Sequence, residues 1–303
     1  MKIIHKIERF KILLIKMLSS IAPLGQAKIR PFVMIVLLLA SFMPAQGHEF
    51  WIETEDWQIA PQEDMRFSLR IGSDFSGFQH GYIPHKFTRF EMMTPQSVQA
   101  VDGRIGDRPA GQIPARQIKA GGEGLYLIRH ETTVETVSYP DVEKFAAFAQ
   151  EKGLSDAVRA HNARGLPRHD FTEIYYRYAK GLIAVGDGIG EDQKLGMDVE
   201  ITALQNPYHL KGDVLPLQLS RNGEVWPHVK VTVFARPLEE EREEAVQKET
   251  YTADAKGLVS ITTRRGYAYL VDAVALEPVQ PDDNNKGAVW LTRWASLTFA
   301  LPQ

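Results

Sequence analysis

The sequence contains no cysteine among its 303 residues. Disulfide bonds, thiolate zinc sites, iron–sulfur clusters and thiol catalysis are therefore excluded. An excess of basic residues is also lacking, because 35 Lys and Arg stand against 38 Asp and Glu, which gives a net charge of −3. A nucleic-acid-binding protein usually has a basic face and a high isoelectric point, so we expect no nucleic-acid partner.

Motifs of the common enzyme classes are missing as well. The sequence has no G-x-S-x-G nucleophile elbow, no Walker phosphate loop, no S-x-x-K followed by K-T-G, and no histidine pair with HExxH spacing. A glycosidase needs two carboxylates held about 5–10 Å apart in a cleft. Nothing in the sequence places such a pair, and we predict a protein that is not an enzyme.

The first recognisable feature of the sequence is an export signal at its N-terminus. Basic residues precede an uncharged apolar run over 32–43, and a proline and small residues lead to a cleavage point after Gly47. This run is shorter than the roughly 20 residues with which a helix crosses a bilayer. We expect residues 1–47 to be removed on export and the mature periplasmic chain to begin at His48. An uncleaved membrane anchor is the alternative.

A mature chain that begins with His48 would carry unusual coordination chemistry. Its free amine and its imidazole could bind one metal ion together, in a small chelate ring. One more imidazole would complete a site of three nitrogen ligands, which suits copper or nickel. The alternative is that His48 is only the residue that follows the cleavage point.

The first part of the mature chain, residues 48–190, is predicted to be a β domain, the first of two antiparallel sandwiches of the immunoglobulin-like or transthyretin-like kind. Apolar and polar residues alternate over short runs, and proline and glycine separate the runs. The predicted strand regions are 49–71, 86–101, 124–138 and the beginning of 181–190.

The pattern changes over residues 140–180, where we predict a helical insertion. Val142, Phe145 and Ala149 recur at helical spacing, and Gly153 is suited to end that helix. A second helix is predicted from Ser155 to Gly165 and a third from Thr172 to Tyr178. Glycines flank the insertion, so we expect it to move as a lid.

Residues 196–303 are predicted to form a second β domain. Several short strands are separated by turn signals, which is typical of an antiparallel sandwich of the immunoglobulin-like or transthyretin-like kind. The segment from Thr252 to Val259 resembles the T-D-x-x-G turn of transthyretin-like domains. The acidic run 239–244 is expected to be a solvated loop, with metal trapping as a less favoured alternative.

Several segments together resemble a known family over nearly the whole mature chain, most specifically at its start and end. They are His48–Glu53, Arg70–Gly72 with Phe75, Arg89–Phe90, Tyr175–Lys180 and Trp294–Phe299. They resemble the domain-of-unknown-function family of DUF4198 type, which is grouped with periplasmic nickel and cobalt uptake accessory proteins. The resemblance implies a secreted β-rich protein that handles nickel, cobalt or another transition metal beside a membrane transporter. One departure is Ala275, near which the resemblance leads us to expect a histidine.

The candidate metal ligands are histidines in separate segments. His80 and His85 are predicted to lie in a loop interrupted by glycine and proline, and His130 lies in a predicted strand. Arg129 and His130 should point to opposite faces of that strand. We predict a site that joins His48 with His80, His85 or His130 and holds nickel, cobalt or copper.

Two other functions are compatible with the sequence. One is a protein-interaction module without metal, which would recruit a transporter or receptor of the cell envelope. The other is a carbohydrate-binding module, whose sugar face would use aromatic residues near the start of the mature chain: Trp51, Trp57, Phe75, Phe78 and Tyr82. Titration with metals, pull-down from membranes and a glycan panel would separate the three functions.

Overall fold

The computed structural model describes residues 48–103, 112–113, 122–239 and 246–303. The predicted signal region, residues 1–47, and most of the acidic run 239–244 lie outside the described residues. The described chain is mainly β, and none of its helices is long and apolar enough to span a membrane.

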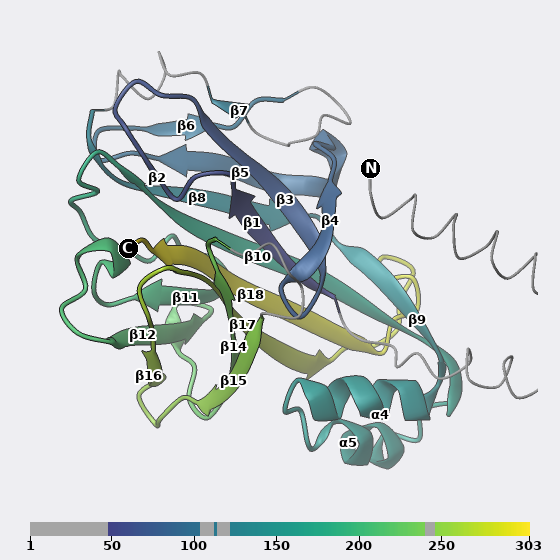
Figure 1. The fold of residues 1–303 in the computed structure, drawn as a ribbon. Helices are drawn as coiled ribbons and strands as arrows, with labels where there is room; N and C mark the ends of the chain where they lie inside the picture. Colours follow the sequence, from purple (N-terminus) through teal and green to yellow (C-terminus); the bar gives the residue numbers. More distant parts are fainter. Residues whose placement is uncertain (1–47, 104–111, 114–121, 240–245) are drawn as a thin grey trace, which may run out of the picture. The chain divides into compact units, whose positions relative to one another are not determined.

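Within the described residues, the strands form three sheets (Figure 1). The first contains β1 (Glu49–Thr54), β3 (Met65–Ser73), β4 (Ser76–His80) and β7 (Gln112–Ile113). The third contains β11 (Val199–Ala203), β12 (Val214–Arg221), β13 (Glu224–Val225) and β16 (Leu258–Thr262).

The second sheet is the largest and runs through both halves of the chain. Its N-terminal members are β2 (Gln58–Ile59), β5 (Phe87–Met93), β6 (Val98–Ala100), β8 (Gly124–Thr132), β9 (Glu135–Asp141) and β10 (His169–Val185). Its C-terminal members are β14 (Lys230–Pro237), β15 (Gln247–Thr252), β17 (Tyr267–Pro278) and β18 (Trp290–Leu301). Short 3-10 helices lie at η1 (Pro84–Lys86) and η2 (Pro207–His209).

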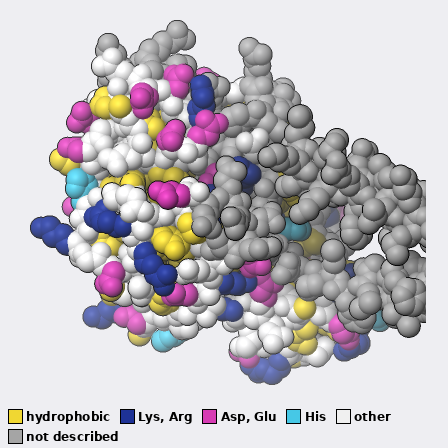
Figure 2. All heavy atoms as spheres, viewed as in Figure 1, with side chains coloured by type: hydrophobic (Ala, Val, Ile, Leu, Met, Phe, Trp, Pro, Cys, Tyr) yellow, Lys and Arg dark blue, Asp and Glu magenta, His cyan; other side chains and the backbone are white. Residues whose placement is uncertain are grey.

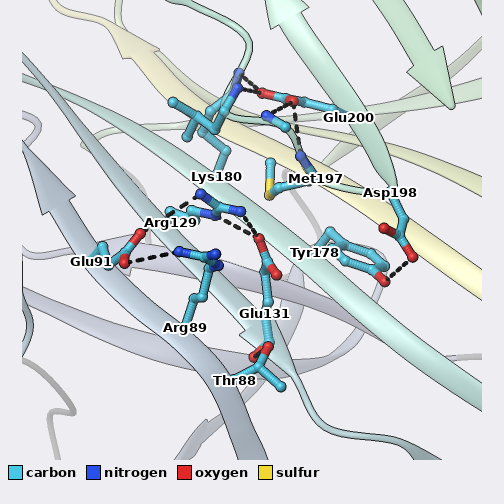
Figure 3. A network of polar contacts seen from close by, with 12 residues as sticks. Thr88, Arg89, Glu91, Arg129, Glu131, Tyr178, Lys180, Met197, Asp198 and Glu200 are labelled. Carbon is cyan, nitrogen blue, oxygen red and sulfur yellow. Dashed lines mark hydrogen bonds and ion pairs between the residues drawn. The ribbon is translucent and has the colours of Figure 1, made fainter. Parts of the chain in front are cut away.

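The two halves meet where β10 pairs with β18 in parallel, from Glu173 opposite Trp290 to Gly181 opposite Thr298. Lys180, fully buried in β10, has its Nζ 2.9 Å from Asp192 and 3.0 Å from Glu200. The Glu200 carboxylate also accepts hydrogen bonds from backbone N–H groups before β11 (Figure 3). One sheet thus spans the predicted boundary near residues 190–196. The division into domains 48–190 and 196–303 stays a prediction.

Strand β1 is buried along its whole length because it packs on both faces. Phe50 and Ile52 join one apolar cluster with residues of β3, β5 and β8, whereas Trp51 joins another with Phe75 and Phe234. Successive side chains of a strand point to opposite faces, which explains this division. The third sheet packs against β14, β17 and β18 through a separate cluster.

The predicted insertion is only partly helical. Helices α4 (Val142–Glu151) and α5 (Ala157–Ala163) follow the expected pattern, and Asp141 caps α4 by accepting a hydrogen bond from Lys144 N. The third predicted helix, Thr172 to Tyr178, is wrong, because those residues lie in β10. Its β-branched and aromatic side chains favour a strand that pairs with β9 and β18.

Candidate functional site

His80 and His130 lie together, although 50 positions separate them in the sequence. Both line a small cavity of about 30 Å³. The ring of Phe50 in β1 lies between their strands, with its centroid 6.2 Å from that of His80 and 5.2 Å from that of His130. A cavity of this size is large enough for a water molecule or a single ion.

His130 is buried among aromatic rings. Its ring centroid lies 5.3 Å from that of Phe87 and 4.9 Å from that of Phe90. Its Nδ1 is buried and has no hydrogen-bond partner among the described residues. Burial, and then the proximity of His80, lowers the pKa of His130 to about 3. The imidazole is therefore neutral near pH 7, which is the form that binds metals.

His80 ends strand β4 and is partly exposed, so its predicted loop position is wrong. Its Nδ1 lies 3.0 Å from the carbonyl oxygen of Gly81. That contact requires the proton on Nδ1 and leaves Nε2 of the neutral ring with its lone pair available. As predicted, Arg129 points away from His130, because Arg129 pairs with Glu91 and Glu131 on the opposite face of β8 (Figure 3).

Charged groups also line this cavity: Lys86, Glu135 and Arg177. Glu135 Oε1 lies 3.0 Å from Lys86 Nζ, and Glu135 Oε2 accepts a hydrogen bond from Tyr175 Oη at 2.7 Å. Burial opposes ionisation of Glu135, but hydrogen bonds from Tyr175 and Lys86 and the charges of Lys86 and Arg177 hold its pKa below the ordinary value. The carboxylate is thus occupied by these partners.

The two remaining predicted ligands lie differently. His48 is exposed and directly precedes β1, and its carbonyl oxygen is 3.5 Å from Arg177 Nη2. Arg177 in turn lies over the ring of Phe50, with Cζ 5.8 Å from the ring centroid. His85 is exposed in η1 and does not line the cavity. Over the described ranges, no three His, Asp or Glu side chains are arranged to hold a metal ion.

A family model described as "Domain of unknown function (DUF4198)" matches residues 45–277. The chain belongs to this family. A search of curated proteins found no match to this DUF4198 protein.

Solved structures match the chain only at very low identity and low TM-score. A tetra-tandem repeat in the extending region of a large adhesion protein is 9% identical with a TM-score of 0.22, over 84% of this chain and 49% of that one. A Salmonella alpha-2-macroglobulin reacted with methylamine is 13% identical with a TM-score of 0.22, and the match covers 85% of this chain and 15% of that one. The DUF4198 chain thus spans half or less of these structures.

The departure at Ala275 does not affect the histidine pair. Ala275 lies in β17 opposite Arg293 and packs in the cluster formed by the third sheet. His130 packs against Phe50, which belongs to a different cluster. A histidine at position 275 would thus be placed in another layer of the protein.

Proposed function

We propose that this DUF4198 protein binds nickel, cobalt or copper in the periplasm and delivers it to a membrane transporter. In this proposal, the ligands are the His48 amine and imidazole together with the imidazoles of His80 and His130. The observation that carries it is the buried Nδ1 of His130, which has no partner among the described residues and belongs to a ring that lines the cavity shared with His80. An unpaired buried polar atom is costly, and a metal ion would give it a partner.

The composition of the cavity supports a transition metal rather than calcium or magnesium. Calcium and magnesium prefer several oxygen ligands. Here Glu135 is engaged by Lys86 and Tyr175, and the other candidate donors are imidazole nitrogens. Nickel, cobalt and copper bond well to such nitrogens.

The position of His48 supports its role as the third contributor. Side chains two positions apart in a strand share a face, so a continued β1 would place His48 on the face of Phe50. Phe50 contacts both His80 and His130. Arg177 contacts the His48 carbonyl and the Phe50 ring, which ties the first mature residue to the cavity wall. Cleavage after Gly47 would free the amine there.

The family supports only part of this proposal. Membership in DUF4198 is shown, whereas the link to nickel and cobalt uptake accessory proteins, the export signal, the periplasmic location and the absence of enzymatic activity are parts of our proposal. We further propose that residues 196–303 form a sandwich of the immunoglobulin-like or transthyretin-like kind. The packing of the third sheet against β14, β17 and β18 supports that assignment.

The test is calorimetric titration of a chain that begins at His48 with nickel, cobalt and copper. We expect His80→Gln and His130→Phe each to weaken binding of the preferred metal by about tenfold or more. His85→Gln is the matched control, because His85 is exposed near the cavity without lining it. Equal affinity in all three variants, or no binding by the parent chain, would contradict the proposal.

A further inference from the structure

A second and much larger cavity lies on the other face of β1. Its volume is about 500 Å³, which is within the range of small-molecule sites. Phe50 points from β1 toward the histidine cavity, whereas Trp51 and Glu53 line the large one. The two cavities are therefore separated by the first sheet, and a ligand in the large cavity would not contact the histidine pair.

Polar side chains of three paired strands form one wall of this cavity. The strand register places Trp51 beside Arg70 and Arg70 beside Gln79, while Glu53 pairs with Ser68 in the next row. The opposite wall comes from the end of β14 and the residues near it: Arg236, Pro237, Leu238 and Val246. Side chains fixed on paired strands give a preorganised surface for recognition.

Glu53 and Arg236 neutralise each other in this cavity. Glu53 Oε2 accepts a hydrogen bond from Trp51 Nε1 at 3.0 Å, and Glu53 Oε1 accepts one from Arg236 Nη2 at 2.6 Å. The Arg236 guanidinium also lies over the ring of Phe75, with Cζ 4.5 Å from its centroid. These groups hold one another in place and leave no net charge.

Arg70 is different, because no carboxylate in the described part of the chain pairs with it. Its Nη1 donates to the carbonyl oxygen of Gly77 at 3.2 Å, and its Nε is buried without a partner among the described residues. The cavity thus contains a guanidinium whose charge has no described counterpart. A carboxylate matches the planar donor fork of arginine.

We infer that this cavity binds a small organic monocarboxylate that also carries hydroxyl groups, with the carboxylate on Arg70. A single unpaired cation suits one negative charge better than the two charges of a dianion such as phosphate. Gln79 and Ser68 offer hydrogen bonds to hydroxyl groups. The aromatic rings of the lining, Trp51, Trp57 and Phe75, are almost completely covered. They offer no open ring face on which a neutral sugar could stack.

The test uses D-gluconate as the probe and sorbitol as the matched neutral probe, with binding followed by calorimetry and by NMR. We expect gluconate to bind the parent chain in the millimolar range or tighter, and sorbitol and inorganic phosphate to bind at least about tenfold more weakly. Arg70→Gln should remove the preference for gluconate. Arg89→Gln, which changes an exposed arginine of β5 outside the cavity, should keep it.

Equal binding of gluconate and sorbitol by the parent chain, or no binding of gluconate, would overturn the inference even if Arg70→Gln fails to fold. Stronger binding of a neutral sugar or of phosphate would also overturn it. The result does not depend on the metal proposal, because the two cavities lie on opposite faces of the first sheet and gluconate is titrated without metal.

Discussion

The ammonium group of Lys152, just after helix α4, lies 2.6 Å from the carboxylate of Glu49 in β1, and both side chains are buried. Asp272 of β17 completes the cluster, with its Oδ2 3.2 Å from the same nitrogen. Burial alone would lower the pKa of Lys152, but Asp272 and Glu49 raise it above its ordinary value. This cluster attaches the helical insertion to the strand that begins next to His48.

Replacing Lys152 should therefore destabilise the fold strongly. We expect Lys152→Met to lower the free energy of unfolding by about 3–5 kcal/mol, since two buried carboxylates lose their counter-ion. Lys144→Met on the exposed side of α4 is the control and should change it by less than about 0.5 kcal/mol. Urea denaturation followed by circular dichroism measures both. Similar stabilities of the two variants would show that the cluster contributes little.

His130 should make the fold less stable in acid. Its pKa is lowered to about 3 by burial and then by His80, whereas an unfolded histidine titrates near 6.5. Its contribution is complete above the unfolded value and is lost as the pH falls toward the folded value. Between pH 7 and pH 5, we expect a loss of about 2 kcal/mol from this group. Denaturation curves of His130→Phe should lack that loss, and an unchanged pH slope in this variant would refute the assignment.

Glu173 should make the fold less stable as the pH rises, which is the opposite of the effect expected for His130. Burial raises its pKa to about 7, against hydrogen bonds from Thr292 and Tyr139 and the charge of Arg177. The folded state keeps the proton that the unfolded state releases near 4.5, so stability from this group is lost as the pH rises from about 4.5 to 7. We expect Glu173→Gln to gain roughly 2–3 kcal/mol relative to the parent chain between pH 5 and pH 8. A constant difference in the free energy of unfolding between the two proteins over this range would contradict the raised pKa of Glu173.

Local structure could be predicted from the sequence where local signals dominate. The Asn222-Gly223 turn between β12 and β13 has positive φ angles of 51° and 82°, as that pair favours. The alternation that separates Arg129 from His130 was also sufficient. Pattern reasoning failed for β10, because its closely spaced tyrosines show no clear period and a helix was predicted there. Its parallel pairing with β18, more than 100 residues later, decides its structure.

The histidine cavity could not be predicted from local sequence signals either. No spacing in the sequence brings His80 and His130 together, because their proximity depends on how β1 packs between β3 and the large sheet. The prediction named both residues but also included His85, which the structure leaves exposed. The large cavity beside Arg70 was not predicted, since its walls come from β1, β3, β4 and the end of β14.

The distribution of surface charge bears on whether the protein binds nucleic acid. On the face shown in Figure 2, acidic and basic side chains of the described residues are intermixed and do not gather in one basic patch. This agrees with the net charge of −3. Retention on heparin at low salt would test the expectation that the protein has no nucleic-acid partner.

The most direct test of the metal proposal compares two chains that differ by one residue. One begins at His48, and the other carries a single glycine before it, which moves the free amine away from the imidazole. Competition titration with copper should show affinity at least about tenfold higher for the chain that begins at His48. Equal affinities, or no binding by either chain, would contradict the claim that the first mature residue anchors the metal.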